Sequence, residues 1–373
     1  MESTPITGLD ELDRHLDDLV QDPALLLNPK LFDDVELQLT ETNIPPLIPR
    51  FLPRLTTILK QYPQDPAVLA SLTIKFLGPV SFTAILQLAS PDDLVQALDS
   101  PAPAANLLVM TILHKAAARP EDVSLLSTNP PLVAALIRRW LAAPQVEVGQ
   151  KGGKVLGDLL DVDCALPPPP PPTRPVDPLH SELSIRRAPG QGQLWNLVFS
   201  TAEMYSLLTA LISGAHPDTA ASPHQLSLAQ GRILRLLPRL ASINFAAVTQ
   251  QPPHPPVASP SAPALTNGTN PSAETESLLH YAALHMIQRA DMLMHLSLVD
   301  FFETLISLTR VTEHSPAKTA ALRTLLCAAT ADDEMLRKAL LHLPERTVEE
   351  EAADLGVWLE ELMPGEEVRL VVR

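Results

Sequence analysis

Leucine and other apolar residues recur at helical spacing along much of the chain. Near the start, the segment LDELDRHLDDLV places its four leucines on one stripe, with aspartates on the opposite face. A stripe of this period is typical of an amphipathic helix that packs one face on a core. The next segment, DDVELQLTETNIPPLIPRFLPRLTTILKQY, has the same period on both sides of Pro45 and Pro46. We expect two helices that break at this proline pair.

Prolines punctuate the helical pattern at similar places. Segments such as QDPAVLASLTIKFL and DSPAPAANLLVMTILHKA have a small or polar residue, then proline, then a helical pattern. Proline is well tolerated in the first turn of a helix, where its missing N–H has no partner. Pro66, Pro101 and Pro144 follow at intervals of 35 and 43 residues. Helix pairs that repeat at roughly 40 residues predict an all-α, HEAT/armadillo-like solenoid. The alternative is chance placement of the prolines.

Two proline-rich segments interrupt the helical pattern. Residues 165–193 contain six consecutive prolines, which favour polyproline II and forbid helix. This segment is either a rigid spacer or a docking segment for an SH3 or WW domain. Residues 249–276 are rich in Pro, Ser, Ala and Asn and carry almost no charge, so we expect a disordered insertion.

These interruptions define the expected domain organisation. We expect N-terminal helical repeats over residues 1–164, a proline-rich linker or insertion over 165–193, and C-terminal helical repeats over 194–373 that contain the 249–276 insertion. The final glutamate-rich segment predicts an amphipathic helix that gives the last repeat a polar outer face.

Composition favours helical layers. Hydrophobic residues make up 46% of the chain but aromatic residues only 4%, so the apolar mass is aliphatic, unlike that of a typical β-sandwich. The 39 prolines are an excess that we expect in linkers or at helix boundaries.

Charge, hydropathy and cysteine content limit the classes of partner and site that we expect for this chain. The formal charge of −16 argues against nucleic acid, since phosphate neutralisation requires a basic surface. A protein with basic patches is a better match. No run of apolar residues in the sequence looks long enough to span a membrane. The two cysteines, Cys164 and Cys327, suggest neither a disulfide framework nor a zinc site. We therefore expect a cytoplasmic or nuclear protein.

The stretch VEVGQKGGKVLGDLLDVD combines glycine with lysine, as phosphate-binding loops do. It lacks the Walker A pattern, because Val148 and Val155 occupy positions where that pattern requires glycine and serine or threonine. Gly149, Gly153 and Gly157 instead share one helix face. Glycine costs roughly 1 kcal/mol against alanine inside a helix. We expect close approach of another backbone to offset this cost, from either the adjacent repeat or a bound partner.

Enzyme and metal patterns are missing from the sequence. It contains no G-x-S-x-G elbow and no H-E-x-x-H pair. His280 and His285 are five residues apart, which places them on different helix faces. We therefore expect a non-catalytic protein with no cofactor and no metal.

Two blocks carry a family resemblance: WLAAPQVEVGQKGGKVLGDLLDVD (residues 140–163) and LWNLVFSTAEMYSLLTALIS (residues 194–213). With the helical repeats, they resemble the fungal proteasome-assembly chaperone family Hsm, formerly labelled a DNA mismatch repair protein. That family is related to the animal S5b subunit, the non-ATPase regulatory subunit five of the 26S proteasome. The resemblance implies a C-shaped helical-repeat scaffold that binds the C-terminal domain of one ATPase subunit of the proteasome base. It also implies contact with a proteasome scaffold subunit.

Candidate contact residues come from solenoid geometry, not from the resemblance. The second helix of each repeat lines the concave surface of a solenoid. Polar residues there need no intramolecular role if that surface is open to a partner. The candidates for protein binding are Lys75, Asn106, His114, Lys151, Lys154 and Asp158.

Two other functions compete with the assembly chaperone. One is a different HEAT/armadillo adaptor, such as a transport or phosphatase scaffold. The other is an enzyme with an unrecognised site, which the missing motifs disfavour.

Overall fold

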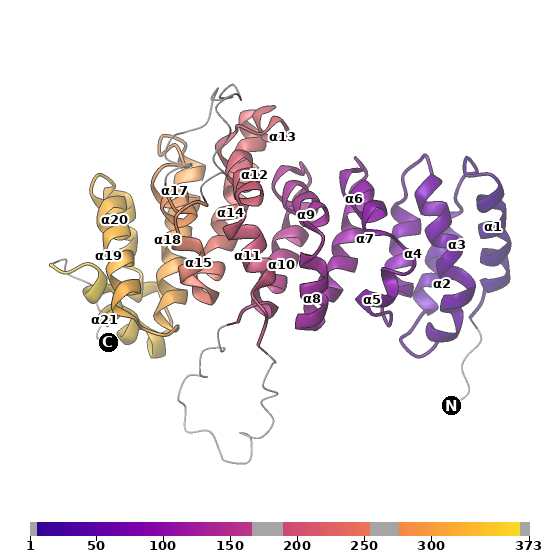
Figure 1. Cartoon of the computed structure of the whole chain (residues 1–373), viewed down its shortest axis with the longest axis horizontal. Coiled ribbons are helices and arrows are strands. Elements are labelled where there is room, and N and C mark those ends of the chain that lie inside the picture. Colours follow the sequence, from indigo (N-terminus) through magenta and orange to yellow (C-terminus); the bar gives the residue numbers. More distant parts are fainter. Residues whose placement is uncertain (1–5, 166–188, 254–275, 366–373) are drawn as a thin grey trace, which may run out of the picture. The chain divides into compact units, whose positions relative to one another are not determined.

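The computed structural model describes residues 6–165, 189–253 and 276–365 (Figure 1). Within these ranges the chain forms helices joined by short connections, and no strand occurs in them. The all-α prediction is confirmed. The chain divides into two compact units, Met1–Leu159 (unit 1) and Leu160–Arg373 (unit 2).

The helices of unit 1 pack in two layers. The first layer contains α1 (Leu9–Gln21), α3 (Ile48–Gln61), α6 (Pro91–Asp99) and α9 (Pro130–Ala142), and the second contains α2 (Pro29–Gln38), α4 (Ala67–Phe76), α7 (Pro103–His114) and α10 (Val146–Val162). Short connecting helices are η1 (Pro45–Leu47), α5 (Phe82–Ile85), η2 (Lys115–Ala118) and α8 (Pro120–Ser127). Helices contact their counterparts in neighbouring pairs: α1 packs on α3, α2 on α4, α4 on α7, and α6 on α9.

Local sequence explains where these helices begin. Pro29, Pro91 and Pro130 each occupy the first turn, directly after a capping Asn or Ser. The cap side chain accepts a hydrogen bond from a free N–H of that turn, which proline itself does not need. The expected break at Pro45 and Pro46 is confirmed, because α3 starts after them.

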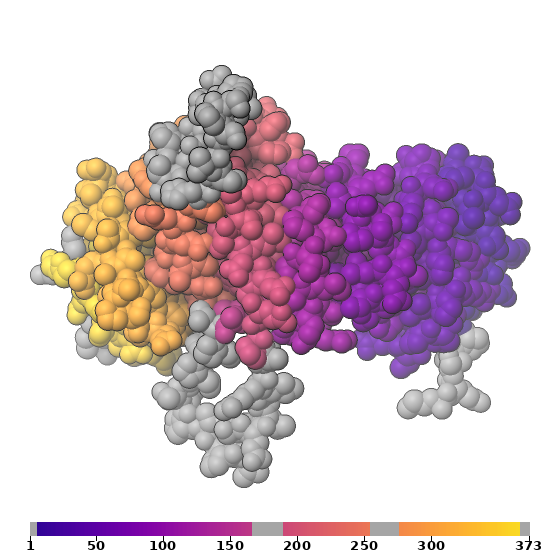
Figure 2. All heavy atoms as spheres, in the orientation of Figure 1, coloured from indigo at the N-terminus to yellow at the C-terminus, as the bar shows by residue number. Residues whose placement is uncertain are grey.

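Leucine stripes and aromatic pairs form the core of unit 1. In α1 the leucines at 12, 16 and 19 are fully buried. Phe51 of α3 stacks on Phe76 of α4, with ring centroids 5.6 Å apart. On the face in Figure 2, side chains fill the space between neighbouring helices of this unit. Each buried leucine contributes about 1.5–3 kcal/mol, which stabilises the contacts between successive pairs.

Two prolines contradict the expectation that prolines lie only in linkers and at helix boundaries. Pro53 lies inside α3, and Pro238 lies inside α14 (Pro223–Ile243). An internal proline costs about 3 kcal/mol. Buried leucines flank both positions, so tertiary packing offsets the lost hydrogen bond.

Unit 2 also has two rows of packed helices. One contains α12 (Ala202–Ser213), α14, α18 (Met292–Arg310) and α20 (Glu334–Leu341), in packing order. The other contains α11 (Gln193–Ser200), α15 (Phe245–Thr249), α17 (Leu278–Leu284), α19 (Pro316–Thr330) and α21 (Glu349–Leu362). The short segment α13 (Pro217–Ala220) links α12 to α14, and η4 (Pro344–Arg346) links α20 to α21. The predicted glutamate-rich terminal helix is α21, which packs on α19 with its glutamates exposed.

Buried polar side chains link the helices of unit 2. Asp163, which is fully buried, accepts hydrogen bonds from the backbone N–H groups of Leu194 (2.6 Å) and Trp195 (3.1 Å) at the start of α11. The Trp195 indole N–H donates to the Leu160 carbonyl (2.8 Å). Lys318 donates to three oxygen atoms near the end of α18. These bonds satisfy backbone groups at helix ends that water does not reach.

The predicted domain limits can be placed on this structure. The division between the units falls inside α10, near the predicted end of the N-terminal block at Cys164. Residues 166–188 of the predicted linker and 254–275 of the predicted insertion lie outside the described residues.

Helix α18 is long and apolar enough to cross a membrane, by length and composition alone. The sequence expectation concerned uninterrupted apolar runs, and charged residues interrupt this one. The helix carries Asp300, Glu303 and Arg310, and its buried face packs on α14 and α20. This packing is that of a core helix.

Candidate protein-binding surface

Four lysines lie on or next to the second-layer helices of unit 1, and we call them the lysine row. Lys75 is exposed in the last turn of α4, and Lys115 directly follows α7. Lys151 and Lys154 lie one turn apart in α10, where Lys151 is half-buried and Lys154 is exposed. The C-terminal end of a helix carries a partial negative charge, which favours the lysines that end α4 and α7.

Contacts connect the first two lysines. The Lys115 ammonium donates a hydrogen bond to the carbonyl oxygen of Gly78, which follows α4 (2.9 Å). Lys75 and Gly78 line the same hollow of about 410 Å³, which also includes Glu36 and Ser71. The Lys115 hydrogen bond therefore joins the end of α7 to the end of α4, where Lys75 lies.

A shared carboxylate connects α7 with α10. His114 Nε2 lies 2.8 Å from Asp158 Oδ2, and the Lys154 ammonium donates to the same oxygen at 3.0 Å. The Asp158 side chain is 21% exposed. Its negative charge also acts on Lys151, whose pKa is lowered mainly by desolvation and raised by Asp158.

Burial affects two of the lysines. Partial desolvation lowers the pKa of Lys151, and the positive charge of Lys154 acts in the same direction. Desolvation also lowers the pKa of Lys115. A half-buried ammonium keeps fewer waters than an exposed one, so less hydration is lost when a carboxylate binds it.

The structure brings together four of the six predicted contact residues. His114, Lys151, Lys154 and Asp158 form one cluster, and the contacts of Lys115 extend it to the end of α4, where Lys75 lies. Lys115 was missed by the sequence reasoning. A signal was present, because Lys115 directly follows the predicted candidate His114.

The prediction that Asn106 contacts a partner is wrong. Its side chain is 1% exposed, and its amide nitrogen donates to the carbonyls of Ala97 (2.9 Å), Leu98 (3.0 Å) and Ser100 (3.1 Å). Asn106 therefore ties the end of α6 to α7 and has no exposed atoms for a partner. The prediction assumed that polar residues on these helices lack an intramolecular role, and for Asn106 this is wrong.

The glycines of α10 serve helix packing. A Cβ atom on Gly152 would lie 2.8 Å from Trp140 Cβ and 3.1 Å from Trp140 Cα in α9, and one on Gly153 would lie 3.1 Å from the indole nitrogen. The sequence predicts that the close neighbour of the glycines is either the adjacent repeat or a bound partner. At these two positions it is the adjacent helix α9. Of these two positions, the closer approach is at Gly152, which the predicted set of Gly149, Gly153 and Gly157 did not include.

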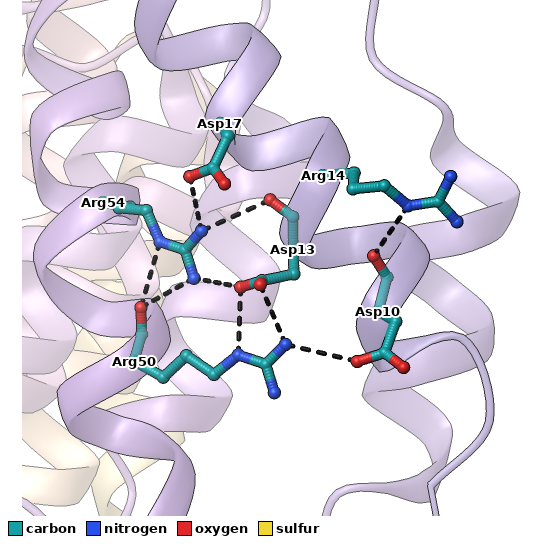
Figure 3. A network of polar contacts seen from close by, with 6 residues as sticks. All are labelled: Asp10, Asp13, Arg14, Asp17, Arg50 and Arg54. Atoms are coloured by element: carbon teal, nitrogen blue, oxygen red, sulfur yellow. Dashed lines mark hydrogen bonds and ion pairs between the residues drawn. The ribbon is translucent and has the colours of Figure 1, made fainter.

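A second charged cluster joins α1 to α3 (Figure 3). The Arg50 guanidinium lies 2.8 Å from Asp13 and 3.3 Å from Asp10, and Arg54 pairs with Asp13 and Asp17. A shallow hollow of about 770 Å³ lies beside it. All five side chains are engaged with one another, so the cluster stabilises the first helix pair and offers little free charge.

Within the described residues, no group of three His, Cys, Asp or Glu side chains is placed to hold a metal ion. Neither Cys164 nor Cys327 forms a disulfide bond in the part of the chain that the structure describes. In comparisons with known proteins, no family model and no curated sequence matches the chain. The geometry of the lysine row and the two sequence blocks are therefore the observations that bear on function.

Proposed function

We propose that the chain is a non-catalytic binding scaffold of the HEAT/armadillo type. The observation that carries this proposal is the two-layer packing of successive helix pairs, with a charged cluster on the second-layer helices α7 and α10. Helical-repeat proteins bind other proteins along the surface formed by equivalent helices of successive repeats. The lysine row lies at the C-terminal ends of α4 and α7 and in the middle of α10.

We propose further that the partner is the C-terminal domain of an ATPase subunit of the 26S proteasome base, so that the chain acts as an assembly chaperone. A proteasome scaffold subunit is a further partner under this proposal. Support comes from the two sequence blocks that resemble the Hsm and S5b family. In space, Asp163 at the end of the first block caps the helix that opens the second block, at Leu194 and Trp195. This function would place the protein in the cytoplasm or the nucleus.

A binding assay with purified components tests this function. The tagged full-length chain is mixed with the C-terminal domain of each base ATPase subunit of the same organism, one at a time. We expect one domain to co-elute with the chain in size-exclusion chromatography, while the other domains serve as matched controls. If none binds, the chaperone function is rejected. Specific binding to a transport or phosphatase subunit instead would favour the alternative adaptor function.

A further inference from the structure

The lysine row is a basic strip in an acidic protein. The chain carries a formal charge of −16, yet α4, α7 and η2 contain no acidic residue. Along these helices the charged side chains are Lys75 and Lys115, next to the titratable His114. In α10 the same strip continues with Lys151 and Lys154. Within this strip, positive charge without acidic neighbours in the same helix is thus confined to α4, α7 and η2, while α10 also carries Glu147, Asp158 and Asp161.

Contacts between neighbouring helices make this strip continuous. Lys75 shares a hollow with Gly78, whose carbonyl accepts a hydrogen bond from Lys115. The preceding residue, His114, contacts Asp158, and Asp158 accepts a hydrogen bond from Lys154. The chain of contacts therefore runs from the end of α4 to the middle of α10 without leaving unit 1.

Positive charge remains available along this strip. Among the described residues, Lys75 and Lys151 form no ion pair, and Lys115 is bound only to a neutral carbonyl. Asp158 is shared between His114 and Lys154. The strip is bordered on one side by the acidic residues of α2, among which Glu36 lines the Lys75 hollow.

We propose that the lysine row binds an acidic helix of a partner protein, laid across α4, α7 and α10. This inference rests on the proposed scaffold function and names the chemistry of the partner's segment. Packed helices lie about 8–10 Å apart, so lysines on successive helices recur at about that interval. A helix advances about 10.5 Å in seven residues. Carboxylates about seven residues apart on one face of a helix therefore match the successive lysines.

An acidic protein segment fits better than nucleic acid. Charge attraction steers an acidic helix toward the strip and fixes its register. A nucleic acid carries continuous charge, which would extend past the short strip and meet the acidic residues of α2. An isolated carboxylate-bearing face avoids that repulsion.

The test uses the full chain and a fluorescein-labelled helical peptide with glutamates about seven residues apart on one face. The matched peptide has the same composition in shuffled order. We expect the first peptide to bind, and raising the salt from ~50 to ~300 mM to weaken binding about tenfold. We expect the shuffled peptide to bind several-fold more weakly.

The decisive variant is K75Q/K151Q/K154Q, which leaves the Lys115 hydrogen bond in place. Its matched control is R14Q/K30Q/R119Q, which removes the same charge from exposed positions elsewhere in unit 1. We expect the first variant to lose about tenfold in peptide affinity and the control to change by less than about twofold. Circular dichroism and thermal unfolding establish that both variants are folded.

Several outcomes would overturn the proposal: no binding of the patterned peptide, unchanged binding by the folded lysine variant, equal binding of the shuffled peptide, or tighter lysine-dependent binding of a single-stranded oligonucleotide. The same lysine variant, tested against the ATPase domains, separates the two proposals. If the variant keeps full binding to an ATPase domain while the peptide fails, the acidic-helix inference falls and the scaffold function stands. If the peptide binds through the lysines but no ATPase domain does, the acidic-helix inference stands and the chaperone function falls.

Discussion

Trp140 restricts position 152 to glycine, because it leaves no room there for a larger residue. The indole and backbone of Trp140 occupy the space where any side chain at position 152 would lie. Trp140 is itself 1% exposed, so it cannot move aside into solvent. The intrinsic cost of glycine in a helix, roughly 1 kcal/mol, is offset by this close packing of α9 on α10.

We therefore predict that Gly152→Ala lowers the free energy of unfolding by about 1–3 kcal/mol, because the added methyl group overpacks the contact with Trp140. Gly231 is the matched control, since it lies inside α14 and a Cβ atom added there would have no neighbouring atom within 4 Å. Gly231→Ala should raise stability by about 0.5–1 kcal/mol. Urea denaturation followed by circular dichroism measures both. Equal effects of the two substitutions would contradict the packing account.

Asp163 has a comparable role through hydrogen bonds. Burial raises the pKa of its carboxyl group, while the N–H groups of Trp195 and Leu194 favour its charged form. Asp163→Ala should lower the free energy of unfolding by about 2 kcal/mol, because two buried N–H groups lose their acceptor. Asp163→Asn keeps an acceptor oxygen and should lie between alanine and the native chain. Chemical denaturation checks this order, and an alanine variant as stable as the native protein would contradict it.

At the scale of elements, the sequence predicted helix positions well and helix contacts poorly. Pro29, Pro91 and Pro130 start helices through local chemistry that is visible in a few residues. The neighbours of Asn106 and Trp140 belong to other helices, and which helices meet depends on packing of the whole unit. Four of the candidate site residues lie close together because His114 of α7 and Lys154 of α10 both contact Asp158, and Lys151 lies one turn before Lys154. Asn106 does not belong to this cluster. From the sequence alone, a polar residue buried at a helix junction cannot be distinguished from an exposed polar residue.

The contact between α1 and α3 should be sensitive to acid. The Arg50 guanidinium, and after it Arg54, holds the pKa of Asp13 at about 2, below its ordinary value of 3.8. Between these two values the unfolded chain binds more protons than the folded chain. The stability contributed by Asp13 is therefore fully present above pH 3.8 and is lost as the pH falls toward about 2.

We predict that Asp13→Asn lowers the free energy of unfolding by about 1 kcal/mol at neutral pH, because the Asp13 side chain is mostly buried between two arginines. The difference from the native chain should shrink as the pH falls below 3.8. Asp33→Asn, at an exposed position in α2, is the control and should have almost no effect. Urea titrations at several pH values measure this, and a difference that grows in acid would contradict the assignment.

At the scale of the whole molecule, stability should be local to neighbouring helix pairs. In both units, helices contact mainly the pairs directly before and after them. The free energy of such an array is approximately a sum of pair terms and nearest-neighbour interfaces. A substitution should therefore loosen its own pair first and distant pairs least, in contrast to a globular domain that unfolds as one body.

Lys318 allows this locality to be tested. Its ammonium donates to the carbonyls of Thr309 (3.1 Å) and Glu313 (2.7 Å) and to the Thr312 hydroxyl (2.6 Å). Lys318→Ala removes this donor, and of the described side chains only the Thr312 hydroxyl then donates to the Thr309 carbonyl. We expect a loss of about 1–3 kcal/mol. Amide hydrogen exchange should accelerate most in α18 and α19 and hardly at all in α1 to α4, because the helices of each unit contact mainly the pairs directly before and after them. Uniform acceleration across both units would show that the molecule unfolds as one cooperative body, and the nearest-neighbour description would then be wrong.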